Sequence, residues 1–138
     1  MLGAVVAGGF IGVALREILL LPFGDGSAAS PHSLVLAAAT MAVNVVGSFA
    51  LGLVVGRLGD GHPIARAFLG TGVLGGFTTY SAFAVQTVAL LGAAPVAGVG
   101  LALVSVLLGI LAAALGVRLT QRPPGTASGA LPAPEATP

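Results

Sequence analysis

The sequence predicts an all-α membrane protein with four transmembrane helices per subunit, the third broken near the middle of the membrane. The first observation is composition: of 138 residues, 57% are hydrophobic and 7% are charged, and the mean hydropathy is +1.10. Because a soluble domain this small leaves much of its surface in water, such a composition excludes a soluble fold. The other two observations are long uncharged apolar stretches, each able to span a bilayer, and a glycine cluster that interrupts one of them.

Charge and cysteine content exclude several classes of function. Five arginines and four acidic residues give a formal net charge of +1, which is no electrostatic footprint for a nucleic-acid partner. The absence of cysteine excludes disulfides and thiolate metal sites. We do not expect an enzyme, because no His, Cys or carboxylate lies in the middle of an apolar stretch, and His32 and His62 fall in predicted loops.

The first predicted helix covers about residues 2–21 and is apolar except for Arg16 and Glu17 near its end. Adjacent helical residues point about 100° apart, so we expect these two side chains not to pair. Arg16 has two interpretations: an anchor that reaches the membrane interface, or a buried cation that keeps a polar vestibule positive. Apolar residues directly after Met1 favour a retained helix over a cleaved signal peptide.

The second predicted helix, about residues 34–56, carries a polar stripe. Thr40, Asn44 and Ser48 stand four residues apart, a spacing that places them along one side of a helix. The Asn44 amide offers two N–H donors and one acceptor. The stripe therefore predicts either interhelical hydrogen bonds that hold the bundle together or donors that line a polar path.

The third predicted helix, about residues 64–92, contains glycines between residues 70 and 76 and then Thr78, Thr79, Tyr80 and Ser81. This is poor material for a continuous helix, so we expect a break, with the second half starting near Thr79. Such a break either exposes carbonyls and helix ends that hold ions or is a kink that packs on a neighbour. Tyr80 and Phe83 share a face, as core residues or with their positive ring edges toward an anion.

The fourth predicted helix covers about residues 95–117, where Ser105 is the only polar side chain and is expected to bond its own i−4 carbonyl. Glycine pairs four residues apart, such as Gly8 with Gly12 and Gly72 with Gly76, predict close helix packing. Residues 1–118 are thus expected to form the four-helix transmembrane domain. Residues 119–138, rich in Pro and Ala, are expected to form a disordered tail.

Arginine placement predicts the orientation. Four spans put both termini on the same side as the loop between the second and third helices. That side carries Arg57, Arg66, Arg118 and Arg122, against Arg16 toward the other side. This positive-inside bias predicts cytoplasmic termini.

Three stretches resemble signature segments of the CrcB/Fluc fluoride channel family, in the right order and helices: Gly9–Arg16 (GFIGVALR), Val43–Gly52 (VNVVGSFALG) and Gly72–Phe83 (GVLGGFTTYSAF). The resemblance covers about residues 3–117. It implies a multi-pass protein of the bacterial plasma membrane that lets fluoride leave the cytoplasm by passive conduction and so reduces fluoride toxicity. It also implies an antiparallel dimer with two fluoride pathways and a structural sodium ion (Na+) at the dimer interface.

The same resemblance assigns residue roles. The positions that match the family's anion pathway are Asn44, Tyr80, Phe83, Ser81, Thr40 and Arg16. The positions that match its sodium ligands, through backbone carbonyls, are Gly75 and Thr78. The chain departs from the family pattern where Tyr80 replaces a usual Phe, Ala82 a usual Thr, and Gln86 a frequent Glu.

Two other functions fit parts of the sequence. A small proton-coupled drug or cation antiporter needs a carboxylate inside the membrane, and the only candidate is Glu17, near a helix end. A non-conducting structural subunit would explain the glycine packing but not the polar stripe or the break. For a channel, the arginine bias opposes an antiparallel homodimer, so the expected partner in the bilayer is either a second copy or a homologous subunit of opposite orientation.

Overall fold

The computed structural model describes residues 1–23, 33–59 and 61–121, and these residues contain helices and no strand. Four helical spans are long and apolar enough to cross a bilayer: Leu2–Phe23, Leu34–Leu58, Pro63–Gly92 and Pro95–Thr120. The predicted fold class, an all-α membrane protein with four spans and a broken third helix, is therefore confirmed. Of the predicted tail, residues 119–138, the first two residues belong to the last helix, which continues to Thr120. Residues 122–138, with Arg122, lie outside the described residues.

The four spans are built from the following helical elements. α1 (Leu2–Leu20) ends in a short 3₁₀ turn, η1 (Leu21–Phe23), and α2 covers Ser33–Leu58. The third span comprises α3 (Pro63–Arg66), a π-helical stretch η2 (Ala67–Leu74), α4 (Gly75–Phe77) and, after the break, α5 (Tyr80–Ala93). α6 (Pro95–Thr120), like α3, starts on a proline, whose missing N–H costs nothing in the first turn.

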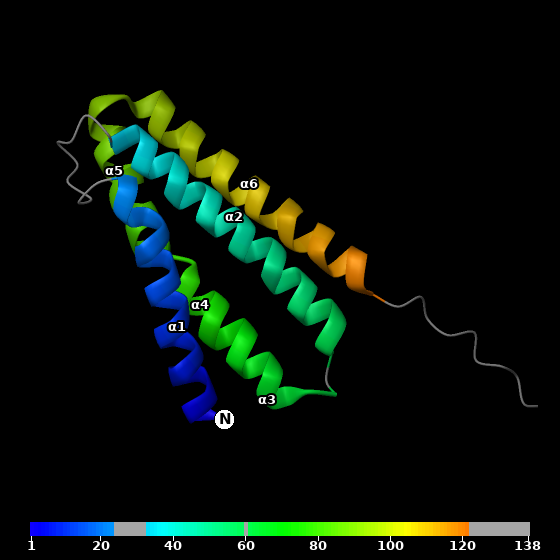
Figure 1. Ribbon diagram of the computed structural model, residues 1–138. Coiled ribbons are helices and arrows are strands. Elements are labelled where there is room, and N and C mark those ends of the chain that lie inside the picture. The colour runs from blue at the N-terminus through cyan, green and yellow to red at the C-terminus, as the bar shows by residue number, and fades with distance from the viewer. Residues whose placement is uncertain (24–32, 60, 122–138) are drawn as a thin grey trace, which may run out of the picture.

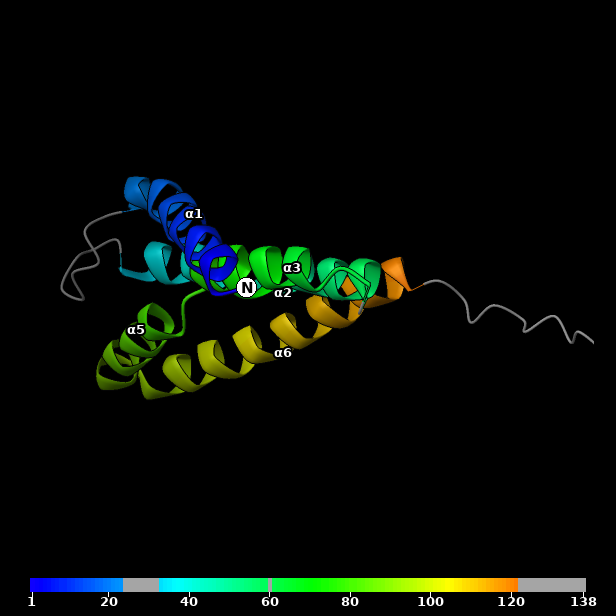
Figure 2. The same cartoon turned by 90° about the horizontal axis from the view of Figure 1, so that it is seen from below.

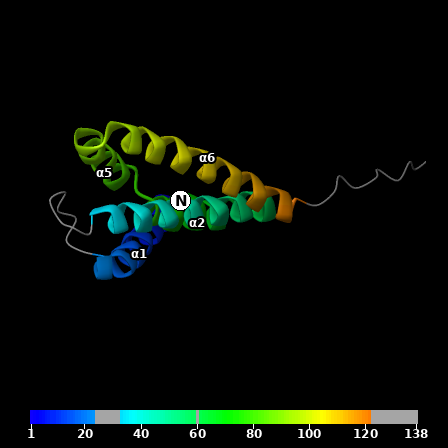
Figure 3. The same cartoon turned by 90° about the horizontal axis from the view of Figure 1, so that it is seen from above.

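The helices form two close pairs (Figure 1). α1 lies along the first half of the third span, and α2 lies along α6. The views from below and above place α2 between α1 and α6 (Figure 2, Figure 3), with α5 beside the start of α6. The N-terminus, the α2–α3 connection and the end of α6 lie at one end of the bundle, as expected for four spans.

Glycines permit both pairings, as the spacing predicts. Between α1 and the third span, the Cα atoms of Gly8 and Gly72 approach so closely that an added Cβ on Gly72 would meet Gly8 Cα at 3.0 Å. A Cβ on Gly12 would overlap the Val73 carbonyl oxygen. Gly52 and Gly116 do the same for α2 and α6, where a Cβ on Gly116 would meet Gly52 Cα at 3.0 Å. The predicted close packing through Gly8, Gly12 and Gly72 is confirmed, whereas the contact of Gly52 with Gly116 was not predicted.

The third span breaks at Thr78 and Thr79, which have extended backbones with ψ angles of 150° and 113°. The glycines before them do not unwind the chain; they lie in the π-helical stretch and in α4. Gly72 and Gly76 pack against α1, and Gly70 faces α2. The second half begins at Tyr80, as the sequence predicts. The packing interpretation is therefore confirmed, and the chain opens immediately after the glycines, whereas ion binding at the break stays a prediction.

Candidate functional site

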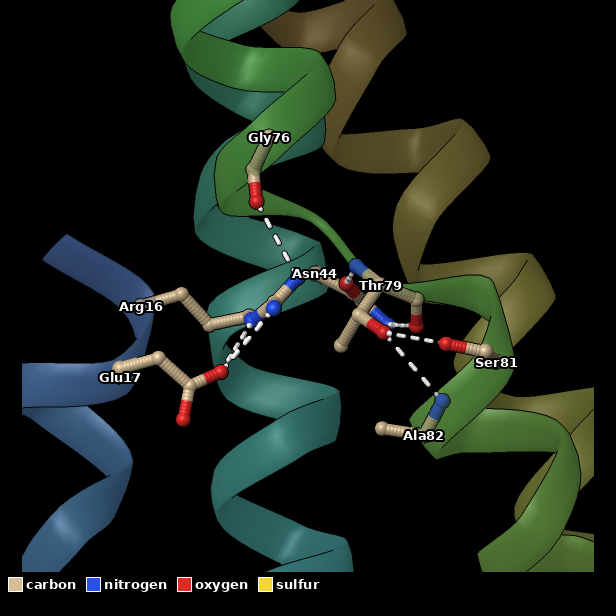
Figure 4. A network of polar contacts seen from close by, with 7 residues as sticks. All are labelled: Arg16, Glu17, Asn44, Gly76, Thr79, Ser81 and Ala82. Carbon is tan, nitrogen blue, oxygen red and sulfur yellow. Dashed lines mark hydrogen bonds and ion pairs between the residues drawn. The ribbon is translucent and has the colours of Figure 1, made fainter. Parts of the chain in front are cut away.

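Thr79 is the centre of the break. Its backbone N–H donates to Asn44 Oδ1 at 2.8 Å, and its carbonyl accepts from Asn44 Nδ2 at 3.1 Å. Its side-chain oxygen accepts from the Ala82 N–H at 3.2 Å and lies 3.3 Å from Ser81 Oγ. Figure 4 shows these contacts converging on Thr79 between α2 and α5. Thr79 thus caps α5 with its hydroxyl and anchors the break to α2 with its backbone.

The Asn44 contacts favour one interpretation of the polar stripe without removing the other. The Asn44 amide makes two interhelical hydrogen bonds, as expected of a group that holds a membrane bundle together. These two bonds use one of its two N–H donors and one of its two acceptor positions. Asn44 therefore fixes the break, and its second N–H is not needed for that role.

The two helix ends at the break are stabilised separately. In a continuous helix the Thr79 N–H would donate to the Gly75 carbonyl, but here that N–H is bonded to Asn44. The Leu74 carbonyl accepts from both the N–H and the hydroxyl of Thr78, at 3.0 and 2.9 Å. The Gly76 carbonyl accepts from Arg16 Nη1 at 3.2 Å. A guanidinium at this position also faces the negative end of the first half-helix dipole.

Arg16 and Glu17 correct one prediction from the sequence. Arg16 Nε and Nη2 donate to Glu17 Oε1 at 3.2 and 3.0 Å, so the two side chains do pair. The 100° angle between adjacent Cβ directions does not prevent the contact, because the long arginine side chain turns back across the helix surface. The Arg16 side chain is 20% exposed and reaches the break. The structure therefore favours the inward-facing cation over the interface anchor.

Two grooves meet at the break. One, the polar groove, has a volume of about 490 Å³, and its polar lining residues are Arg16, Glu17, Thr40, Thr79, Ser81 and Gln86. Across it, Gln86 Nε2 donates to the fully buried Thr40 Oγ1 at 3.0 Å. Gln86 Oε1 is buried and has no hydrogen-bond partner among the described residues. The polar groove thus brings together three predicted site residues, Arg16, Thr40 and Ser81.

The other, the aromatic groove, has a volume of about 320 Å³ and is lined by residues that include Asn44, Ser48, Gly75, Thr78, Tyr80, Phe83 and Ser105. The Tyr80 and Phe83 rings are 6.4 Å apart between centroids and tilted by 49°, so they share a face as predicted. Tyr80 is 82% exposed. These two aromatic residues do not line the polar groove with Arg16; they lie on the other side of the break.

The α2 stripe contributes to both grooves. Thr40 lines the polar groove, whereas Asn44 and Ser48 line the aromatic groove. Ser105 behaves differently from the prediction, because its hydroxyl is buried and has no hydrogen-bond partner in the described part of the chain. Local bonding to the i−4 carbonyl does occur at Thr78 and Thr120. Ser105 is a lining residue of the aromatic groove.

Thr79 is the residue of this site that the sequence interpretation missed. A threonine directly before a helical run is a common N-cap, and this signal identifies its side-chain role. Its pairing with Asn44, 35 positions away, has no local sequence signal.

Comparisons with known protein sequences identify the family to which the chain belongs. Residues 3–117 match the family described as CrcB-like protein, Camphor Resistance (CrcB). The chain is 44% identical over 100 residues to Fluoride-specific ion channel FluC 2 of Leifsonia xyli subsp. xyli, covering 68% of this chain and 64% of that protein. It is 41% identical over 124 residues to Fluoride-specific ion channel FluC of Hyphomonas neptunium, covering 86% and 93%. It is 38% identical over 121 residues to Fluoride-specific ion channel FluC 2 of Bacillus subtilis, covering 86% of each chain.

Proposed function

The chain belongs to the CrcB family, and on this premise we propose that it is a fluoride channel that lets fluoride leave the cytoplasm by passive conduction. The observation that carries the proposal is the match of residues 3–117, which includes the whole break and both grooves. Two relatives whose names specify fluoride align over 86% of this chain. Passive export would lower cytoplasmic fluoride and so reduce its toxicity.

The chemistry of the two grooves supports an anion of this kind. Fluoride is small and strongly hydrated, so its passage requires many hydrogen-bond donors in place of water. The second N–H of Asn44, the hydroxyls of Ser81 and Tyr80, and the edges of the Tyr80 and Phe83 rings are neutral donors of this type. Neutral donors replace water without forming a strong cationic trap, which would slow the exit of the ion.

We assign the pathway to the α2 stripe and the two grooves that it joins. In this assignment Arg16, Thr40 and Ser81 act on the polar side of the break, and Tyr80 and Phe83 act on the aromatic side. Asn44 has two roles: it holds the break open and offers a donor to the ion. Tyr80 stands where the family pattern has a phenylalanine. Tyr80 is exposed and lines the aromatic groove, so its hydroxyl adds a donor there.

A structural sodium ion fits the end of the first half-helix. Its candidate ligands are the backbone carbonyls of Gly75 and Thr78, which are neutral oxygens at a helix C-terminus, a donor type that holds sodium in broken transmembrane helices. The fit is supported by the Thr79 N–H, whose bond to Asn44 removes the donor that a continuous helix would give the Gly75 carbonyl. When bound, the ion would supply positive charge to a helix end that is otherwise negative.

We further propose that the working unit is an antiparallel dimer in the lipid bilayer. Large apolar side chains are exposed along the helices, for example Phe10, Val88 and Leu103, and these faces require lipid or a second subunit. The partner is either a second copy or a homologous subunit of opposite orientation, a choice raised by the arginines near the cytoplasmic ends. Reconstitution of the chain alone, followed by subunit counting and fluoride efflux, distinguishes the two.

Fluoride efflux from proteoliposomes tests the proposal, with chloride efflux measured in parallel. The channel assignment predicts rapid fluoride loss and no chloride loss. Substitution Phe83→Ile retains an apolar side chain but removes the ring edge. We expect it to slow fluoride efflux at least tenfold, which corresponds to a rise of about 1.4 kcal/mol in the free-energy barrier to fluoride passage. Absence of fluoride efflux, both alone and with a homologous subunit, would refute the proposal.

A further inference from the structure

Glu17 is a carboxylate in a groove that we assign to an anion. Within residues 1–23, 33–59 and 61–121 it is the only acidic side chain, and it lines the polar groove with Thr40, Ser81 and Gln86. Its side chain is 62% exposed. Like charges repel, so a carboxylate here reduces the attraction of the groove for an anion. Its presence therefore requires an explanation from its contacts.

Among the described residues, the Glu17 side chain is bonded to Arg16. Glu17 Oε1 accepts from Arg16 Nε and Nη2 at 3.2 and 3.0 Å, and Arg16 Nη1 donates to the Gly76 carbonyl at 3.2 Å (Figure 4). Three of the five guanidinium N–H groups are thus engaged on one side by a carboxylate and on the other by the helix end. Glu17 occupies the Nε–Nη2 face, one of the two-pronged faces with which a free guanidinium would bind an anion.

We propose that Glu17 is a positioning residue for anion passage, acting through Arg16. It turns the guanidinium toward the Gly76 carbonyl and offsets its charge, so that the polar groove admits the anion without retaining it. This inference rests on the proposed channel function. It follows from the requirement that a conducting site bind an ion strongly enough to admit it and weakly enough to release it.

The test is the dependence of fluoride efflux on fluoride concentration. Glu17→Gln keeps the size of the side chain and removes its charge, which leaves the Arg16 charge uncompensated. We expect the half-saturating fluoride concentration to fall roughly tenfold and the maximal rate to fall as well, because tighter binding slows release. Added inert salt should reduce efflux through the variant more than through the wild type, because salt screens uncompensated charge. Glu17→Ala removes the same charge and serves as a second variant.

A double substitution separates this role from a merely structural one. If Glu17 acts through Arg16, the fall in maximal rate caused by Glu17→Gln disappears when Arg16→Gln is also present. Equal half-saturating concentrations and equal salt dependence in the wild type and Glu17→Gln would overturn the inference and leave the channel assignment intact. A wild type that conducts no fluoride would overturn both.

Discussion

Asn44→Ala is the substitution that most directly perturbs the break. It removes both hydrogen bonds to the Thr79 backbone. In the wild type, Asn44 Nδ2 donates to the Thr79 carbonyl at 3.1 Å, and the Thr79 N–H donates to Asn44 Oδ1 at 2.8 Å. Thr79 is only 6% exposed, so neither backbone group regains a partner from bulk water. The substitution therefore acts at the point where α2 fixes the two halves of the third span.

The size of the effect follows from the lost hydrogen bonds, the cost of unpaired buried groups, and the partial relief that an alternative acceptor gives. A hydrogen bond between membrane helices contributes on average about 0.6 and at most about 1.7 kcal/mol, whereas a buried polar group left unpaired costs about 1–3 kcal/mol. The Thr79 N–H has an alternative acceptor, because it can return to the Gly75 carbonyl if the helix closes. We therefore expect a loss of about 1–3 kcal/mol in the free energy of unfolding, or roughly 5- to 150-fold in the equilibrium constant.

Denaturant unfolding in detergent micelles measures this loss, and fluoride efflux measures its functional consequence. Asn44→Asp is the matched control, because it is isosteric and retains an acceptor for the Thr79 N–H but loses the donor. We expect the control to lose less stability than Asn44→Ala and yet to conduct fluoride poorly, since its charge repels an anion. An Asn44→Ala variant within about 0.5 kcal/mol of the wild type, the range of a neutral surface substitution, with unchanged efflux, would refute the reasoning.

Two further substitutions test the scaffold around the break. Gly12→Ala should destabilise the subunit by about 1–3 kcal/mol through overpacking, because the added Cβ overlaps the Val73 carbonyl oxygen. Gly9→Ala is the control, because its Cβ meets nothing within 4 Å. Equal denaturation midpoints for the two variants would contradict the packing account. Thr79→Val removes the hydroxyl that caps the Ala82 N–H at 3.2 Å and should cost about 0.5–2 kcal/mol by denaturant unfolding, and an unchanged midpoint would show that the cap is not stabilising.

The fold could be predicted because the signals are local. Apolar stretches long enough to span a bilayer and small residues four apart are properties of neighbouring positions. Together with the run of glycines, threonines, Tyr80 and Ser81, they predicted the spans, close helix packing through glycines and the break near Thr79, but not which helices pair. The stripe of Thr40, Asn44 and Ser48 was also visible, because the helical period alone places these residues on one side.

The contacts of the site could not be predicted in the same way. The partners of Asn44 are backbone groups of Thr79 rather than a side chain. Every residue type has these backbone groups, so the sequence does not indicate which residue is the partner. Arg16 and Glu17 were predicted not to pair, because adjacent helical side chains point about 100° apart. The flexible arginine side chain nevertheless reaches the Glu17 carboxylate. The Ser105 hydroxyl was expected to donate to its own i−4 carbonyl, but it is buried and has no hydrogen-bond partner among the described residues. These features depend on how side chains pack between helices.

The central claim is that the grooves joined at Asn44 conduct fluoride, and its most direct test is a comparison of fluoride and chloride efflux from proteoliposomes containing the purified chain. The measurement is made for the wild type and Phe83→Ile at matched protein density, each alone and together with a homologous subunit of opposite orientation. We predict rapid fluoride efflux from the wild type in at least one of these preparations, at least tenfold slower efflux from Phe83→Ile, and no chloride efflux from either. Fluoride efflux no faster than from protein-free vesicles in every preparation, or equal efflux of the two ions, would contradict the account.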